Sequence, residues 1–517
     1  MDGDLHRRLI EEILRARERV YHIGAPTPLQ RAEIPGVDAE VHLKREDLSP
    51  IHAYKWRGAY SCMSMLPDAA RARPVIASSA GNHAQGVALA ARRLDLRARI
   101  FMPLSTPEMK RLSVARHGGD AVEIVLTGDS FNEAAAAAEA EAATTGGAFI
   151  HPYDDLYTIA GQATIADEIV LSGAGPFDIA FIQIGGGGMA AGVSSWLKLH
   201  YPGIRIIGVE AEGQASMKAS LAAGAPVSLE VVDRFCDGTA VRRPGDLCFA
   251  ICRDTLDEVI TVSNDAVSAA METTWRIGRY IPEPSGALGL AGLMAYADNN
   301  PDAVHGQRLL GLICGANMDF SKLRLISASA AMGAHRQRWL RIAIDETGGS
   351  LLELIETHFA GFNIAAFQYG KVDTARAWPV IAVEGAPDAL AAAIAAAQAA
   401  ARAAGLSVED VSGEPDIRFR AIHHDPGLIA HPAAFQVQFP ERQGALRELL
   451  RAIAGTANIC YFNYVYTGEE VGRALMAFEL ADDSPATRDA FIARAEASGV
   501  RLDPLSEAAR ARLLQTD

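Results

Sequence analysis

Lys55 carries the most distinctive chemistry of the chain, because three other segments supply groups that can work with its amine. A single lysine predicts little, since most lysines only solvate a surface. The accompanying groups are polar side chains and a run of glycines: Ser79, Ala80, Gly81, Asn82 and His83; Gly185, Gly186, Gly187 and Gly188; Cys314, Gly315, Ala316 and Asn317. A nucleophilic amine, an anion-binding main chain and neutral polar side chains are what a small aldehyde cofactor needs.

The four glycines follow an apolar run that ends at Ile184, and a helix is expected to begin near Met189. Without Cβ atoms, successive N–H groups can turn toward one anion, and the helix adds its positive end. The glycines therefore predict a phosphate site. A nucleotide-hydrolysing loop is excluded, because Met189-Ala190 stands where that loop needs lysine followed by serine or threonine.

Two other interpretations of the glycines stay open. The spacing Gly185-x-Gly187-x-x-Ala190, with Glu210 about twenty residues further on, also fits the dinucleotide fingerprint of an NAD-dependent oxidoreductase. That interpretation leaves Lys55 and Asn82 unexplained. The glycines could also serve only tight packing.

Residues 78–83 follow a short apolar run and open a helix, so their hydroxyl and N–H groups suit a carboxylate, here that of a substrate. Asn82 can hydrogen-bond a ring hydroxyl. The same segment also fits an ordinary helix N-cap, and both interpretations remain.

At 517 residues and 55.0 kDa the chain exceeds the usual size of one core, so two or three domains are expected. Its 48 basic and 63 acidic residues give a net charge of −15, which argues against nucleic acid and anionic membranes as main partners. Six scattered cysteines without a CxxC pair fit a reducing cytoplasm. Cys248 and Cys252 have no histidine at ligand spacing, and no metal site is predicted.

Residues 1–325 alternate short apolar runs with alanine- and leucine-rich stretches of helix length. The runs include 75–77, 98–102, 179–184, 204–209 and 309–314. Runs that are apolar on both faces and separated by helices are typical of a buried parallel sheet. The first part is therefore predicted to be an α/β enzyme domain.

The tail of the chain, beyond about residue 338, repeats itself at an offset of 95 residues, which is 444 minus 349. The matching pairs are Gly349 with Gly444, Asn363 with Asn458, Phe367 with Phe462, and Tyr369 with Tyr464. Each copy, 338–411 and 432–505, follows the order strand, helix, strand, strand, helix, strand. That order resembles the ACT-like regulatory module, a βαββαβ sheet with helices on one face, which binds amino acids. A polar linker is expected at 320–337.

Taken together, these segments resemble a fold-type II pyridoxal-phosphate enzyme, and more closely the biosynthetic threonine dehydratase family. The resemblance covers nearly the whole chain and extends to further segments: 27–29, 57–60, 151–155, 159–162, 237–241 and 283–287. It implies a tryptophan synthase β-like catalytic fold, a pyridoxal 5′-phosphate cofactor and conversion of L-threonine to 2-oxobutanoate and ammonia in isoleucine biosynthesis. L-Serine is the implied secondary substrate.

The resemblance also implies roles for individual residues. Lys55 forms the Schiff base, Asn82 contacts the cofactor's 3-hydroxyl, and Met189 joins the four glycines around its phosphate; Ser79, Ala80, Gly81 and His83 become substrate contacts. Cys314 falls where the family usually has a serine facing the pyridine nitrogen. A neutral thiol cannot lend that nitrogen a formal charge, so the ring is a weaker electron sink, which favours elimination over transamination. Glu283 either lies near the cofactor or caps a loop.

For the tail, the resemblance implies a homotetramer inhibited by isoleucine, with valine as a candidate activator. The implied effector contacts are Phe367, Tyr369, Phe462 and Tyr464, although aromatic residues at strand spacing also fit a core. A non-enzymatic alternative stays open, in which the chain is an amino-acid sensor whose catalytic half is inactive.

Overall fold

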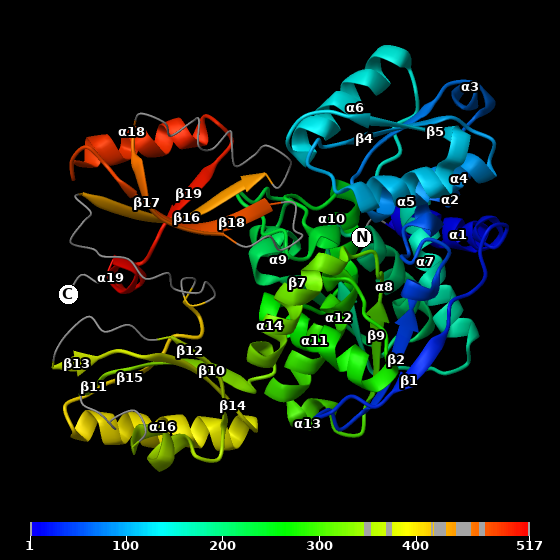
Figure 1. Ribbon diagram of the computed structural model, residues 1–517. Helices are drawn as coiled ribbons and strands as arrows, with labels where there is room; N and C mark the ends of the chain where they lie inside the picture. Colours follow the sequence, from blue (N-terminus) through cyan, green and yellow to red (C-terminus); the bar gives the residue numbers. More distant parts are fainter. Residues whose placement is uncertain are drawn as a thin grey trace. The chain divides into compact units, whose positions relative to one another are not determined.

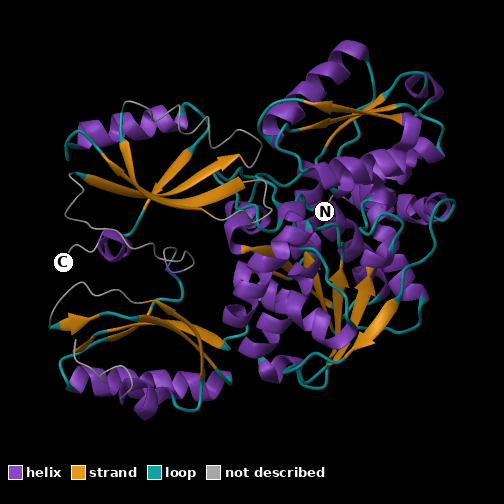
Figure 2. Ribbon diagram, viewed as in Figure 1, coloured by secondary structure: helices purple, strands orange, loops and turns teal. Residues whose placement is uncertain are grey.

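The computed structural model describes residues 3–345, 353–368, 375–414, 417, 431–440, 456–464 and 471–514. The chain divides into two units, Met1–Ala330 and Ala331–Asp517, and both contain helices and strands (Figures 1 and 2). The α/β class predicted from the sequence is confirmed. None of the helices in these described ranges is both long and apolar enough to cross a membrane.

The larger sheet of the first unit has six strands. Only β1 is antiparallel to its neighbour, and the other neighbouring pairs are parallel. In spatial order the strands are β1 (Leu29–Ala32), β2 (Glu40–Arg45), β9 (Arg308–Ile313), β6 (Ile179–Gln183), β7 (Arg205–Ala211) and β8 (Glu258–Val262). The central strands β9, β6 and β7 are buried apart from the first residues of β9 and β7, which explains why their sequences are largely continuous apolar runs.

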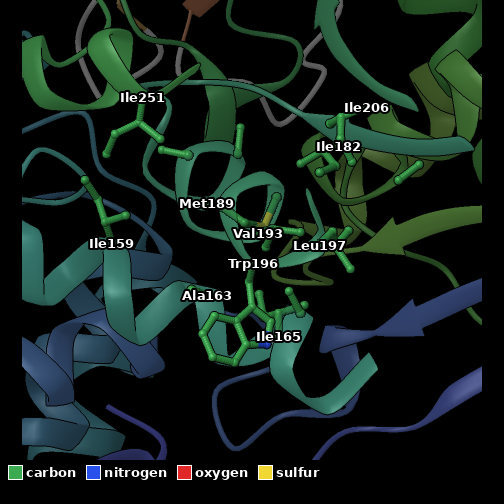
Figure 3. Packing of buried hydrophobic residues seen from close by; sticks show 14 of the residues in the cluster. Ile159, Ala163, Ile165, Ile182, Met189, Val193, Trp196, Leu197, Ile206 and Ile251 are labelled. Atoms are coloured by element: carbon green, nitrogen blue, oxygen red, sulfur yellow. The ribbon is translucent and has the colours of Figure 1, made fainter. Parts of the chain in front are cut away.

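Helices cover both faces of this sheet, and alternate residues of each strand serve the two faces. Ile182 and Ile206 pack with α7 (Leu156–Leu171), α8 (Gly188–His200) and α10 (Asp246–Thr255), as Figure 3 shows. Phe181 and Ile207 pack on the other face with α11 (Asn264–Gly278) and α12 (Pro284–Asn299). The remaining large-sheet helices are α1 (Gly3–Val20), α9 (Ser216–Ala223) and α13 (Pro301–Val304).

A smaller parallel sheet has its own core. It consists of β3 (Val75–Ser78), β4 (Ala98–Met102) and β5 (Val122–Leu126). The helices of this part are α2 (Trp56–Ser64), α3 (Asp68–Arg71), α4 (Asn82–Arg93), α5 (Glu108–Gly118) and α6 (Phe131–Thr145). The runs predicted as strands at 75–77, 98–102, 179–184, 204–209 and 309–314 all form strands, which confirms that part of the sequence analysis.

The expected linker at 320–337 is largely helical. A 3-10 turn, η5 (Phe320–Lys322), leads into α14 (Leu323–Gly333), and β10 begins at Gln337. Ile326 and Ala330 are buried, one helical turn apart. The division between the two units, after Ala330, lies within the expected linker, and this short apolar stripe is enough to hold its helix.

The second unit contains two sheets with the same strand order. The first is β12 (Asn363–Gln368), β14 (Val380–Glu384), β10 (Gln337–Ile342) and β15 (Val408–Asp410), accompanied by α16 (Pro387–Ala403). The second is β17 (Asn458–Tyr464), β18 (Val471–Glu479), β16 (Pro432–Pro440) and β19 (Arg501–Pro504), accompanied by α18 (Pro485–Glu496). Short additional elements are β11 (Ile344–Asp345), β13 (Arg376–Ala377) and a π-helical turn, η6 (Ile355–Phe359).

The internal repeat extends to an irregularity in the strands. In the first sheet the pairing register shifts between Ile364 and Ala366, and in the second it shifts between Ile459 and Tyr461. These positions are 95 residues apart, as are Asn363 and Asn458. Both copies therefore carry a β-bulge at the same place.

The second copy departs from the expected pattern of helices on one face. Phe491 of α18 packs against Phe435 and Phe478 on one face of the sheet. On the opposite face, Leu513 of the C-terminal helix α19 (Glu507–Leu514) packs with Ala434 and Leu475. The expected module ended at residue 505, so it did not include this helix.

Candidate active site

A cavity lies in the first unit, at the carboxyl ends of β6 and β9. This edge is where parallel sheets usually bind ligands. Its walls come from segments far apart in the sequence: Tyr54, Lys55, Asn82, Tyr153, Gln183, Gly185, Gly186, Gly187, Gly188, Met189, Ala190, Gly238, Thr239, Val241, Glu283, Ser285 and Cys314.

Lys55 immediately precedes α2, and its side chain enters the cavity. The Nζ atom donates to the carbonyl oxygen of Pro152 at 3.0 Å. Because the surrounding protein excludes water from the ammonium group, the pKa of Lys55 falls to about 8. A substantial share of this amine is therefore neutral near physiological pH, which makes it a usable nucleophile or base.

A buried group of charges holds α2 in place below Lys55. Arg57 contacts Glu46 at 2.8 Å and Glu168 at 2.6 Å, and Lys44 also pairs with Glu168. Two cations and two anions balance inside the protein. Removing one partner of such a buried pair is destabilising, because the other charge is left unpaired. These contacts therefore hold the start of α2 in one position.

The glycine loop forms the opposite wall and leads into α8. Gly187 has φ +100°, a conformation that side chains with Cβ atoms rarely adopt. A Cβ atom at Gly186 would lie 2.3 Å from the ring of Tyr153. Within the described residues no side chain caps the start of α8, so its first N–H groups are available to an anion.

Met189 contributes to this wall through its main chain. Its side chain is 4 % exposed and packs into the core with Val193, Ile182 and Ile206 (Figure 3). This packing fixes the first turn of α8 and hence the direction of its N–H groups.

Asn82 begins α4 and is held between two polar side chains. Its Oδ1 accepts from Asn317 Nδ2 at 2.8 Å, and its Nδ2 donates to Glu283 Oε1 at 2.6 Å. Burial, and then the nearby Asp237, raise the pKa of Glu283 to about 8. Of the two interpretations of Glu283, the structure supports a place in the cavity, since its side chain bonds Asn82 instead of capping α12.

Cys314 and Gln183 lie together at the end of the neighbouring strands β9 and β6. Cys314 Sγ donates to the carbonyl oxygen of Ser285 at 3.5 Å, and burial raises the pKa of its thiol, which stays neutral. Gln183 Nε2 donates to the Leu312 carbonyl oxygen at 3.2 Å, while its Oε1 is buried without a partner among the described residues. This end of the cavity is polar but carries no formal charge.

The other residues of the segment 79–83 do not line the cavity. His83 Nε2 lies 2.9 Å from the carbonyl oxygen of Ile150, and burial lowers its pKa to about 3. Ser79 Oγ accepts from the N–H of Gly81. Ser79, Ala80 and Gly81 remain partly exposed, and their substrate contacts stay predictions.

The predicted effector contacts lie in the second unit, apart from this cavity in the sequence. Phe367 belongs to β12, while Phe462 and Tyr464 belong to β17. Phe462 packs against the core of its module, as the core interpretation expected. Tyr369 lies outside the described residues. Their role in effector binding stays a prediction.

The sequence analysis missed seven cavity residues: Tyr54, Tyr153, Gln183, Gly238, Thr239, Val241 and Ser285. Five of them lie inside the segments 151–155, 237–241 and 283–287, which were noted only as part of the resemblance. Gln183 had a signal of its own, because it is the single polar residue of the apolar run 179–184.

The ribose-binding role that the dinucleotide interpretation gives to Glu210 is not supported by the structure. Glu210 is fully buried, and its two oxygens accept from the N–H groups of Met217 and Lys218 at 2.8 Å. It serves as a cap for α9.

Comparison with known proteins agrees with this geometry. Residues 20–315 match the model of the pyridoxal-phosphate dependent enzyme family, and residues 429–514 match the C-terminal regulatory domain of threonine dehydratase. The biosynthetic L-threonine dehydratase of Burkholderia multivorans is 37 % identical over 488 residues, which is 94 % of this chain and 95 % of that protein. The Escherichia coli counterpart is 38 % identical, with 92 % of each chain covered.

The chain belongs to the biosynthetic threonine dehydratase family. Among solved structures it is similar to the processed form of threonine deaminase isoform 2 from Solanum lycopersicum, with a TM-score of 0.61 and 40 % identity over 64 % of this chain and 94 % of that one. Maize serine racemase gives a TM-score of 0.57 and 30 % identity over 63 % of this chain and 98 % of that one.

The cavity fits pyridoxal phosphate, the cofactor of this threonine dehydratase family. The glycine loop and the uncapped start of α8 suit a phosphate, because side chains there would fill the cradle. Lys55 offers a partly neutral amine, and Cys314 offers a neutral thiol. The cavity therefore offers N–H groups for the anionic phosphate and neutral groups for the rest of the cofactor.

Proposed function

We propose that the chain is a pyridoxal-phosphate-dependent threonine ammonia-lyase, which converts L-threonine to 2-oxobutanoate and ammonia and accepts L-serine as a secondary substrate. The observation that carries this proposal is that the Lys55 amine and the glycine cradle line one cavity. The names of the similar proteins support the substrate.

Each residue of the site has a role in this proposal. Lys55 holds the cofactor covalently, the N–H groups of residues 185–189 bind its phosphate, and Asn82 contacts its ring hydroxyl. Cys314 faces the ring nitrogen. The uncapped start of α8 and the bonded Asn82 side chain support these assignments.

The chemistry divides between the cofactor and the chain. Pyridoxal phosphate, when bound, supplies an electron sink that stabilises negative charge at the substrate Cα. Lys55 Nζ, released when the substrate amine takes its place, would take the Cα proton, because its lowered pKa leaves the free amine partly neutral. The neutral Cys314 thiol adds no charge at the ring nitrogen, so the sink stays weak and loss of the β-hydroxyl is favoured over transamination.

The second unit is proposed to make the enzyme sensitive to isoleucine as an inhibitor, with valine as an activator, in a homotetramer. A coupling free energy of about 1–3 kcal/mol would change affinity by about 5- to 150-fold. We assign residues 1–325 to catalysis and 338–411 and 432–505 to the two ACT-like modules. The six unpaired cysteines support a reducing, cytoplasmic location.

One experiment separates this function from its rivals. The full chain is incubated with pyridoxal phosphate, reduced with borohydride and digested, and the adduct is located by mass spectrometry; 2-oxobutanoate formation from L-threonine is then measured with and without isoleucine. We expect an adduct on Lys55 and turnover that isoleucine inhibits. Lys55→Ala should lose the adduct and the turnover but should still bind isoleucine. An inactive sensor would bind isoleucine without turnover, and an NAD-dependent oxidoreductase would form no adduct.

A further inference from the structure

Three polar side chains from separate parts of the first unit form a directed hydrogen-bond chain along the cavity. Asn317 follows β9, Asn82 begins α4 and Glu283 precedes α12. Asn317 Nδ2 donates to the carbonyl oxygen of Ile51 at 2.7 Å and to Asn82 Oδ1 at 2.8 Å. Both hydrogens of the Asn317 amide are thereby used.

The main-chain carbonyl of Ile51 sets the direction of the whole chain. A carbonyl oxygen only accepts, so the atom of Asn317 that faces it must be the nitrogen. The atom of Asn82 that faces Asn317 must then be its oxygen, and Asn82 Nδ2 is left to face Glu283 at 2.6 Å. One N–H of Asn82 is bonded to Glu283, and the second remains for the cavity.

Glu283 is a carboxyl group without a cation of its own. It is 3 % exposed, and the two lysines near it bind Asp237 instead, Lys110 at 2.6 Å and Lys322 at 3.6 Å. A buried carboxyl that lacks a cation but has a carboxylate neighbour favours its neutral form, which agrees with its raised pKa.

Groups that titrate surround Glu283 on every side. They are Tyr54 and Lys55 before α2, Cys236 and Asp237 at η4 (Asp237–Thr239), Lys110 on α5, Cys314 after β9, and Lys322 in η5. Burial keeps the tyrosine and the two cysteines neutral, and Asp237 stays ionised between its lysines. Lys55 is bound covalently once the cofactor is present under the proposed function. Among these side chains, Glu283 is the one left to titrate in the loaded site.

We propose that Glu283 is a positioning residue that stores a proton beside Asn82, and that this proton keeps Asn82 available to the cofactor's ring oxygen. When Glu283 loses the proton to solvent, its carboxylate attracts Asn82 Nδ2 more strongly and repels an anionic oxygen nearby. Cofactor contact and substrate binding then weaken together. This inference rests on the proposed cofactor site and goes beyond the family assignment.

The test uses the full chain loaded with pyridoxal phosphate. Glu283→Gln keeps an oxygen that accepts from Asn82 and a similar volume, but it cannot titrate. In the wild type we expect the cofactor's absorption spectrum and the KM for L-threonine to change with a midpoint at about pH 8, as the carboxyl titrates. In Glu283→Gln this alkaline transition should vanish.

Glu210→Gln is the matched control, because Glu210 is also buried with a raised pKa of about 7 but caps α9 outside the cavity. It should leave the transition unchanged. Infrared spectra of the cofactor-free chain give a second readout, since the C=O stretch of a neutral carboxyl at neutral pH should weaken in Glu283→Gln.

The outcomes separate the two proposals. An alkaline transition that survives in Glu283→Gln, or an infrared difference showing Glu283 ionised at neutral pH, would overturn the role of Glu283. A wild-type chain that forms no adduct on Lys55 would refute the proposed function instead, whatever the infrared result.

Discussion

Alanine at Gly186 should weaken cofactor binding through one identifiable contact, the ring of Tyr153. The new Cβ would lie 2.3 Å from the ring, at least 1.2 Å short of the 3.5 Å at which carbon atoms make favourable contact. Either the ring or the loop must move by about 1 Å. Overpacking of this kind costs about 1–3 kcal/mol, so we expect the Kd of pyridoxal phosphate to rise by about 5- to 150-fold.

Gly188 offers a matched comparison within the same loop. A Cβ there would meet the main chain of Tyr153, with 2.8 Å to its carbonyl oxygen and 3.0 Å to its Cα. That main chain is fixed, because Cys248 Sγ donates to the Tyr153 carbonyl and Asp154 accepts from three N–H groups at the start of α10. Gly188→Ala should therefore weaken binding regardless of the Tyr153 side chain.

The assay is cofactor titration of the cofactor-free chain, followed by absorbance, in single and double variants. In a Tyr153→Ala background, Gly186→Ala should add little to the Kd, whereas Gly188→Ala should still raise it. This explanation would be refuted if Gly186→Ala raised the Kd equally with and without the Tyr153 ring. It would also be refuted if Tyr153→Ala restored the Kd of Gly188→Ala. Gly203→Ala, where the added Cβ meets no atom within 4 Å, controls for loss of a glycine.

Three further predictions follow from burial. Arg57→Met should lower the free energy of unfolding by about 3–5 kcal/mol in denaturant titrations, because it leaves buried carboxylates unpaired, while Arg243→Met on the exposed surface should cost less than about 1 kcal/mol. Attachment of pyridoxal phosphate needs a neutral Lys55 amine, so the initial rate of attachment should rise with pH, with a midpoint at about pH 8. The rate is measured in Glu283→Gln, which removes the titration of Glu283. A midpoint near 10.5, the usual pKa of lysine, would contradict the lowered pKa of Lys55. Phe491→Ala should destabilise the second module by about 3–5 kcal/mol in a calorimetric scan, and a loss below about 1 kcal/mol would show that its ring is not part of the core.

The sequence predicted elements well where one local signal decided them. The apolar runs became strands, and the glycines after Ile184 lead into α8 as expected. Lys55 and Cys314 line the same cavity although 259 positions separate them (314 minus 55). The sequence analysis could place them in one site only because the resemblance supplied this long-range information.

Features that depend on tertiary contacts were not predicted. The place of Tyr153 beside Gly186 results from the way α10 anchors its neighbour Asp154, which no local pattern reveals. The linker formed α14 because Ile326 and Ala330 are buried, and this depends on what packs against them.

The pairing of the last strand in each half of the tail shows where the two halves differ in length. Equivalent residues of the first three strands differ by 95 in number, from Gln337 and Pro432 to Glu384 and Glu479. In the last strand the difference is 94. Leu340 pairs with Asp410 in the first copy, whereas its equivalent Phe435 pairs with Pro504 in the second. A single residue gained or lost inside a strand would turn its apolar side chains outward, whereas the connection through the second helix can absorb it. Engineered insertions should therefore be placed between the third strand and the fourth.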